Sequence, residues 1–215
     1  GEEAGREVTM DECRQAYMGF FSTVPERNLE LFRRLRSEGY RELVLTGIEI
    51  SSWGHDLKDG SSFMDLLETV SEAAGNMRIR LGSLEPRTVT EDFCRRLASL
   101  GTLCRHFHLS LQSGCDRTLK NMNRKYDTAT FFEKTELLRK YFPDCGITCD
   151  IIVGFPGETE AEFEETLSLL EEVRFDSLFT FIYSRREGTR AASLPDPVSR
   201  EEKQRWFDRL LEVQK

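Results

Sequence analysis

The sequence predicts an α/β fold with a parallel sheet, and three observations support that prediction. Short apolar runs rich in branched and aromatic residues, which are typical of strands, recur along the chain. One amphipathic helical pattern lies between each pair of successive runs, and such repeated strand–helix units form parallel sheets with right-handed crossovers. At 215 residues, the chain is long enough to bury one sizeable core. The expected strands cover residues 41–47, 77–83, 106–112, 146–155 and 177–184.

The expected helices alternate with these strands, and two of them carry recognisable start signals. Thr88 or Thr90 precedes a helix with acidic residues in its first turn, and either can act as its N-cap. Thr159 is followed three residues later by Glu162, the pattern of a capping box. The expected helices lie near residues 26–38, 62–74, 89–100, 128–141 and 159–173, and an amphipathic helix ends the chain within 198–215.

Composition and charge restrict the possible partners. No apolar run approaches the length of a membrane span, and the polar first residues do not read as a signal peptide. A net charge of −8 argues against a domain that binds DNA or RNA by bulk attraction. The basic clusters at 123–125 and 184–190 are expected to be solvated surface. We therefore expect a cytoplasmic protein without a membrane or DNA partner, and the oligomeric state stays open.

The cysteines do not predict a disulfide framework. They are scattered through apparent helices and strands of a mid-sized domain. Cys145 and Cys149 lie four residues apart but have no third partner nearby, so we expect a pair in the core rather than a metal site. The six cysteines are Cys13, Cys94, Cys104, Cys115, Cys145 and Cys149.

Polar residues stand at the ends of the expected strands, where the sites of parallel α/β proteins are built. These residues are Thr46, Gly47, Glu85, Gln112 and Asp150. Gly47 and Glu85 also fit purely structural roles in turns. Asp150 lies inside an apolar strand, where an unpaired carboxylate is costly. It therefore needs either a structural partner or a ligand, and the sequence leaves both open.

Five blocks of sequence together resemble one family, the radical S-adenosylmethionine domain of the tRNA methylthiotransferases. The blocks occur in the family's order from about residue 39 to residue 205. "LQSGCDRTLKNMNRKY" is closer to the tRNA enzymes than to the relatives that modify a ribosomal protein. The first half is more similar to the threonylcarbamoyl-adenosine branch, and "RFDSLFTFIYS" to the isopentenyl-adenosine branch. The five blocks are "LVLTGIEISSWG", "RIRLGSLEPRTVTEDF", "HFHLSLQSGCDRTLKNMNRKY", "ITCDIIVGFPGETEAEFEET" and "FTFIYSRREGTRAASLPD".

The resemblance implies a fold, a chemistry and a partner. The fold is a half-open (βα)6 radical-SAM-type partial barrel of parallel strands, with the reaction at the strand ends. In the family, three cysteines hold a [4Fe-4S] cluster whose open iron binds S-adenosylmethionine. The resulting 5′-deoxyadenosyl radical removes hydrogen from C2 of adenosine 37 of tRNA. Sulfur and a methyl group follow, which makes the family one of transferases that modify tRNA.

The resemblance also assigns the polar residues at the strand ends. Glu85, Gln112, Arg124 and Asp150 match the residues that grip the ribose and methionine of S-adenosylmethionine. Thr46 and Gly47 match the backbone edge that receives its amino group. A zwitterionic ligand needs carboxylates for its ammonium and hydroxyl groups and an arginine for its carboxylate, so the residue types suit it.

The stretch "DECRQAYMGF" departs from the family pattern. The family has Cys-x3-Cys-x2-Cys at this point, and Cys13 matches its first ligand. Tyr17 and Phe20 occupy the spacings of the second and third ligands, and neither supplies a thiolate. The resemblance thus implies an incomplete ligand set in which Cys13 is the one remaining metal ligand. The first strand and its loop are the least family-like part of the chain.

We expect three segments: a degenerate or divergent cluster-loop region at 1–28, the barrel core at 29–198, and a C-terminal helix at 199–215. That helix ends where the family's tRNA-binding module begins, and we expect the module to be absent. Two functions stay open. The chain is either a methylthiotransferase domain, as a fragment or degenerate copy, or an inactive barrel. Such a barrel would bind S-adenosylmethionine weakly or serve as an interaction domain.

Overall fold

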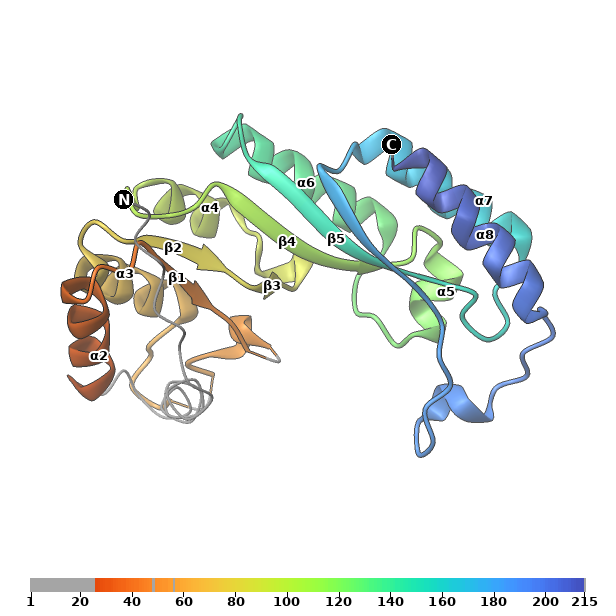
Figure 1. Cartoon of the computed structure of the whole chain (residues 1–215), viewed down its shortest axis with the longest axis horizontal. Coiled ribbons are helices and arrows are strands. Elements are labelled where there is room, and N and C mark those ends of the chain that lie inside the picture. Colours follow the sequence, from red (N-terminus) through yellow and green to blue (C-terminus); the bar gives the residue numbers. More distant parts are fainter. Residues whose placement is uncertain (1–25, 48, 56, 215) are drawn as a thin grey trace, which may run out of the picture.

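The strands form one curved layer in which every pairing is parallel (Figure 1). A computed structural model describes residues 26–47, 49–55 and 57–214. β1 (Glu42–Leu45) pairs with β2 (Arg78–Leu81). A second sheet has the order β3-β4-β5-β6, formed by Ser83–Leu84, His106–Gln112, Gly146–Val153 and Ser177–Ile182. The five predicted strands and their parallel arrangement are confirmed.

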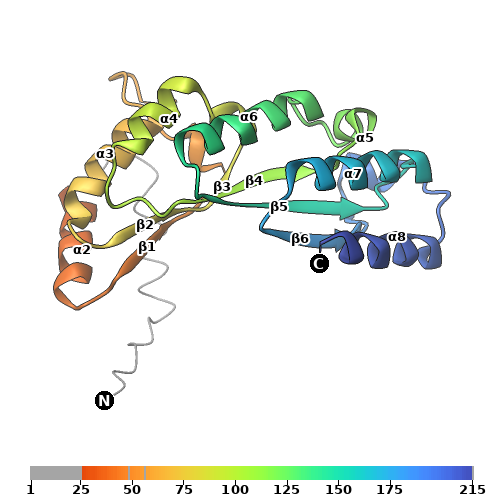
Figure 2. The ribbon, with the colours of Figure 1, turned by 90° about the horizontal axis from the view of Figure 1, so that it is seen from above.

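The larger helices lie on one face of this layer. Figure 2 shows α3, α4, α6 and α7 stacked on the same side of the strands, while α8 lies beside β6. The helices are α2 (Glu26–Ser37), α3 (Phe63–Ala74), α4 (Glu91–Ala98), α5 (Asp116–Asn121), α6 (Thr128–Tyr141), α7 (Glu160–Val173) and α8 (Arg200–Val213). Among the described residues, no helix is both long enough and apolar enough to cross a membrane.

The predicted helix starts are correct in detail. Thr90 caps α4 and accepts a hydrogen bond from the backbone N–H of Phe93. Thr159 and Glu162 form the capping box of α7, in which each side chain accepts a hydrogen bond from the other residue's backbone N–H. The short helix α5 was not predicted. The division into residues 1–28, 29–198 and 199–215 remains a prediction.

A glycine between β2 and β3 divides the predicted strand 77–83 between two sheets. Gly82 donates from its backbone N–H to the carbonyl oxygen of Leu45 at 2.7 Å. A Cβ at this position would lie 3.1 Å from the same oxygen and 3.0 Å from the Thr46 hydroxyl. The close approach explains why glycine stands here, and it fixes the end of β1 against the bend.

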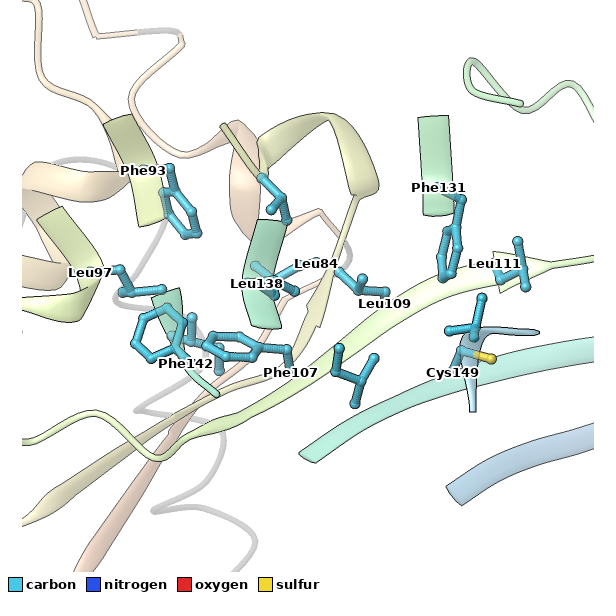
Figure 3. Close-up of a cluster of buried hydrophobic side chains, with 14 of the residues drawn as sticks. Leu84, Phe93, Leu97, Phe107, Leu109, Leu111, Phe131, Leu138, Phe142 and Cys149 are labelled. Atoms are coloured by element: carbon cyan, nitrogen blue, oxygen red, sulfur yellow. The ribbon is translucent and has the colours of Figure 1, made fainter. Parts of the chain in front are cut away.

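The core lies between the sheet and the helices that cover it. Figure 3 shows side chains of β3, β4 and β5 packed against those of α4 and α6. The rings of Phe107 and Phe142 lie 5.0 Å apart, and Phe107 is fully buried. Cys149 is fully buried in this cluster, and Cys145 packs at its edge. Both belong to the core, as the sequence predicted.

Strand alternation assigns the remaining side chains to the opposite face of the sheet. Leu109, Cys149 and Leu178 are buried on the helix side. Their neighbours His108, Asp150 and Phe179 therefore point away from the helices. We call this second surface the inner face, and it carries His106, His108, Thr148, Asp150, Phe179 and Phe181.

Candidate functional site

The structure brings the predicted site residues to the carboxyl end of the strand layer. Thr46 and Gly47 follow β1, Glu85 follows β3, and Gln112 is the last residue of β4. Asp150 lies three residues before the end of β5, beside Phe179 of β6. Because every strand runs in the same direction, these positions share one edge of the sheet.

Asp150 has a structural partner on the inner face. Its Oδ2 lies 3.2 Å from Nε2 of His108, on the neighbouring strand. The side chains of His108 and Asp150 are 13% and 27% exposed, so both are largely shielded from water. Within the described part of the chain, Oδ1 of Asp150 makes no hydrogen bond. One carboxylate oxygen is thus anchored, while the other is available to a ligand.

A chain of hydrogen bonds continues from this pair along the inner face. The Thr148 hydroxyl lies 3.0 Å from Nδ1 of His108 and 3.1 Å from Nε2 of His106. Burial, with help from the positive charge of Arg80, lowers the pKa of His106. Its Nδ1 is buried and has no hydrogen-bond partner among the described residues. The network holds His108, and through it Asp150, in one orientation.

Sequence reasoning did not find this network, although a signal for it existed. "HFH" in β4 and "TCD" in β5 each place polar residues at alternate positions. Alternate residues of a strand share one face, so all four polar side chains had to lie on the same side of the sheet. The parallel register of the two strands then brings them into contact.

The carboxylate of Glu85 already forms an ion pair with Arg87. Its carboxylate accepts hydrogen bonds from the Arg87 guanidinium at 2.9 to 3.1 Å. Arg87 lies in a one-turn 3₁₀ helix, Pro86–Thr88, which begins directly after Glu85. A ligand at Glu85 must therefore share the carboxylate with Arg87 or displace it.

Tyr126 connects the segment after α5 with the end of β4. Its hydroxyl donates to the carbonyl oxygens of Ser110 and Leu111, where the register of β4 with β5 shifts. Burial raises the pKa of Tyr126 to about 12, while the nearby positive charge of Arg124 opposes this rise and the charge of Glu85 adds to it. Tyr126 thus holds an irregular strand end in place, and the charges of Glu85 and Arg124 both act on it. The sequence analysis missed this residue.

The turn after β4 is held rigidly against α7. Gln112 is buried and has a φ of 78°, a left-handed conformation that costs a non-glycine residue energy. The backbone N–H of Gly114 donates to the Thr166 hydroxyl at 3.0 Å. A Cβ on Gly114 would lie 2.6 Å from the Thr166 Cα. The position of Gln112 at the edge is therefore fixed by packing rather than by its own preference.

Arg124 is the one predicted cofactor-binding residue that lies neither in a strand nor in the first two residues after one. It follows α5 after Asn123, which also has a positive φ, and it is exposed. Its backbone N–H donates to the carbonyl oxygen of Leu119 at 2.9 Å, which fixes the turn. Within the described residues the guanidinium forms no ion pair, so it can meet an anion.

The described residues contain no metal centre. In residues 26–47, 49–55 and 57–214, no group of three His, Cys, Asp or Glu side chains is placed to hold an ion. Burial raises the pKa values of the cysteine thiols in this part, and that of Cys94 reaches about 11. The loop that carries Cys13, Tyr17 and Phe20 lies outside the described residues, so the expectation for Cys13 stays a prediction.

Comparison with known proteins identifies the family. Residues 12–170 match the Radical SAM superfamily. The chain belongs to this superfamily. The match covers most of the chain and includes every predicted cofactor-binding residue, Thr46, Gly47, Glu85, Gln112, Arg124 and Asp150.

Curated relatives narrow the resemblance to tRNA-modifying enzymes. The chain is 44% identical over 192 residues to a tRNA-2-methylthio-N(6)-dimethylallyladenosine synthase of Clostridium botulinum, covering 89% of this chain and 43% of that enzyme. A synthase of the same name from Syntrophotalea carbinolica is 44% identical over 86% of this chain and 42% of its own length. The predicted likeness to tRNA methylthiotransferases is confirmed. The chain spans less than half the length of these relatives.

Solved structures agree on the fold. Coproporphyrinogen III oxidase from Escherichia coli, described as a radical SAM enzyme, superposes with a TM-score of 0.60 at 18% identity, over 96% of this chain and 48% of its own. A radical S-adenosylmethionine methyltransferase from Kitasatospora setae, solved with cobalamin and a [4Fe-4S] cluster, also gives 0.60, at 15% identity, over 75% and 31% of the two chains. The partial radical SAM barrel predicted from the sequence is confirmed.

Proposed function

We propose that this chain is the radical SAM domain of a tRNA methylthiotransferase that acts at C2 of adenosine 37. The observation that carries the proposal is the set of charged groups at the carboxyl edge of a radical SAM fold. Asp150 offers a carboxylate oxygen without a hydrogen bond there, Glu85 follows β3 at the same edge, and the charges of Glu85 and Arg124 both act on Tyr126 at the end of β4. The names of the curated relatives support both the reaction and the tRNA substrate.

The described residues fit S-adenosylmethionine by their chemistry. Carboxylates suit its ammonium and ribose hydroxyl groups, and a guanidinium suits its carboxylate. In this proposal Asp150 and Glu85 accept hydrogen bonds from the ligand, and Arg124 pairs with its carboxylate. Gln112 lines the same edge in a fixed conformation. The backbone after β1, at Thr46 and Gly47, receives the amino group.

The same residues do not fit a [4Fe-4S] cluster. A cluster with one open iron needs three thiolates, and the described cysteines are scattered thiols whose pKa values are raised. In the sequence, Cys13 is followed by Tyr17 and Phe20 at the ligand spacings. We therefore derive no reaction step through a cluster, and we propose that the chain is a degenerate copy or a piece of such an enzyme.

The names of the relatives indicate which modified adenosine is the target. The Clostridium botulinum and Syntrophotalea carbinolica relatives both carry dimethylallyladenosine in their names. We propose that the parent activity belongs to that isopentenyl branch, in line with the "RFDSLFTFIYS" block. The first half of the sequence is more similar to the threonylcarbamoyl-adenosine branch. This likeness does not change the choice, because the matches to the two relatives cover 86% to 89% of the chain and so include most of that half.

Tyr17 and Phe20 stand at the spacings of two cluster ligands, and their presence favours a second function. If no cluster forms, the barrel would act as a scaffold that binds S-adenosylmethionine weakly, because the amino-acid end of the ligand has no iron to anchor it. The two functions share the ligand but differ in chemistry. Reconstitution with iron and sulfide, followed by an assay for S-adenosylmethionine cleavage under strong reductant, separates them.

Calorimetric titration with S-adenosylmethionine tests the shared part of the proposal. We expect weak binding that falls further in Glu85→Ala and in Asp150→Ala, because each change removes an acceptor. Asp144→Ala is the matched control, since this exposed acid lies at the other end of β5. Binding that is equal in all three variants would show that the ligand does not use this edge.

A further inference from the structure

Two phenylalanines of β6 are exposed on the inner face. Phe179 and Phe181 are each 53% exposed, whereas Leu178, on the helix side of the same strand, is buried. Alternate residues of a strand share a face, so both rings project in the same direction. β6 is the last strand of its sheet within the described residues, which leaves this aromatic pair at an edge.

The backbone spaces the two rings regularly. Residues two apart on a strand are about 6.6 Å apart along its axis. Phe179 is supported from one side by His108, with ring centroids 5.5 Å apart in an edge-on arrangement. Phe181 makes no ring contact with the described residues. The sheet thus presents two aromatic surfaces in a row, which is how several RNA-binding sheets present theirs.

Arginines follow directly after this aromatic pair. The strand geometry extends past Ile182, since the backbone N–H of Tyr183 donates to the carbonyl oxygen of Val153 at 2.8 Å. Arg185, Arg186 and Arg190 come next and are exposed, with Glu187 as the one acid among them. Within the described part, none of the three arginines forms an ion pair. A local positive surface thus stands on a chain whose net charge is −8.

The aromatic pair and the arginines together indicate a ligand more clearly than either group does alone. A charge cluster alone is usually a solvated surface. An exposed apolar pair alone fits a second copy of the chain or another protein as well as any ligand. Exposed rings that are followed along the chain by guanidinium groups without ion pairs match a polyanion with unpaired bases, because bases stack on aromatic side chains and phosphates pair with arginine.

We propose that Phe179 and Phe181, together with Arg185, Arg186 and Arg190, form a binding surface for single-stranded RNA. Unpaired bases stack on the two rings, and the neighbouring phosphates pair with the arginines. The choice of RNA rests on the proposed function, and the surface itself goes beyond that function. Inside a duplex each base pair stacks on its two neighbours, so only the terminal pairs offer a face to these rings.

The test compares two labelled RNAs with the full chain. One is a short hairpin with an unpaired loop, and the other is a blunt duplex of the same stem. Fluorescence anisotropy is measured at several salt concentrations. We expect the hairpin to bind at least about tenfold more tightly than the duplex, as stacking of one or two bases predicts.

Variants assign the binding energy to each part of the surface. In Phe179→Leu/Phe181→Leu, hairpin affinity should fall about tenfold or more while its salt dependence is unchanged. In Arg185→Ala/Arg186→Ala, the slope of log affinity against log salt should fall by about 1.4, because single strands give about 0.7 per phosphate contact. Arg33→Ala, in α2 at the opposite end of the molecule (Figure 1), and Leu211→Ala, an exposed leucine of α8, should change neither quantity.

Three results would overturn the proposal. The hairpin could bind no better than the duplex, the phenylalanine variant could bind normally, or the chain could form a dimer that the phenylalanine variant dissolves. Circular dichroism and thermal unfolding of each variant show that it is folded, as expected for exposed positions. Phe179 contacts His108, which holds Asp150, so the comparison with S-adenosylmethionine binding uses two other variants. Arg185→Ala/Arg186→Ala should weaken hairpin binding alone, and Asp150→Ala should weaken S-adenosylmethionine binding alone. The two proposals therefore fail separately.

Discussion

His108 holds the carboxylate of Asp150 from the neighbouring strand, with Nε2 3.2 Å from Oδ2. The contact explains how an acid can stand inside an apolar strand without a large energetic cost. Thr148 orients the imidazole from the other side, at 3.0 Å from Nδ1. The free oxygen Oδ1 then faces the inner side of the sheet in a defined direction. A structural pair and a ligand site, which the sequence left as alternatives, are thus compatible in one residue.

Removal of His108 should weaken binding of S-adenosylmethionine through Asp150. One hydrogen bond is worth about 0.5–1.5 kcal/mol, so His108→Ala should reduce the affinity roughly threefold to tenfold. His108→Gln keeps a donor toward Asp150 and should recover most of the loss. Calorimetry measures the affinities, with the exposed His55→Ala as control. Equal affinity in His108→Ala and the unmodified chain would contradict the positioning role.

Glu158 should make the stability of the chain depend on pH. Its side chain is buried between β5 and α7, and burial raises its pKa from 4.5 to about 7, although the backbone N–H groups of Gly154 and Phe155 oppose this by donating to Oε2. The folded chain therefore binds a proton more tightly than the unfolded chain. The free energy of unfolding should fall as the pH rises from 4.5 to about 7, by roughly 2–3 kcal/mol.

Glu158→Gln isolates this contribution. The amide resembles the protonated acid and does not titrate, so the fall attributed to Glu158 should vanish. His106 acts with the opposite sign, because its lowered pKa makes the unfolded chain bind the proton more tightly. The informative quantity is therefore the difference between the variant and the unmodified chain in urea unfolding across this pH range. A difference that does not change with pH would refute the assignment.

Gly114→Ala should destabilise the turn that follows β4. The added Cβ would lie 2.6 Å from the Thr166 Cα and 3.2 Å from the Leu169 Cβ, so α7 must move away. Overpacking of this kind costs about 1–3 kcal/mol. Gly101→Ala is the matched control, because a Cβ there meets nothing within 4 Å. Urea unfolding should show a loss only for Gly114→Ala, and equal stability of the two variants would contradict the packing argument.

Much of the fold follows from local patterns. Alternating apolar runs gave every major strand, because each strand buries one face against helices. Capping residues such as Thr90 and Thr159 fixed helix starts, since they satisfy backbone donors within their own turn. Division of the strand at Gly82 was not predictable, because it depends on the distance between Gly82 and Leu45 in the folded chain.

The position of the candidate site in the fold was predictable, but the contacts of its residues were not. The carboxyl edge follows from parallel topology alone, and the family resemblance named the residues on it. The partners of those residues depend on register: His108 reaches Asp150 only because β4 and β5 pair in parallel at that level. Tyr126 reaches the carbonyl oxygens of Ser110 and Leu111 from fifteen or sixteen residues along the chain. No local pattern in the sequence specifies such a contact.

The unmodified chain should not take up a [4Fe-4S] cluster. The described cysteines cannot replace the missing ligands, because burial raises their pKa values and a cluster needs thiolates. Anaerobic incubation with iron and sulfide should leave the purified protein colourless. The variant Tyr17→Cys/Phe20→Cys completes the family spacing with Cys13 and should gain the brown absorption. Cys13→Ser in that variant should remove the gain. Cluster uptake by the unmodified chain would show that thiolates outside this loop serve as ligands, and the proposal of a degenerate site would then be wrong.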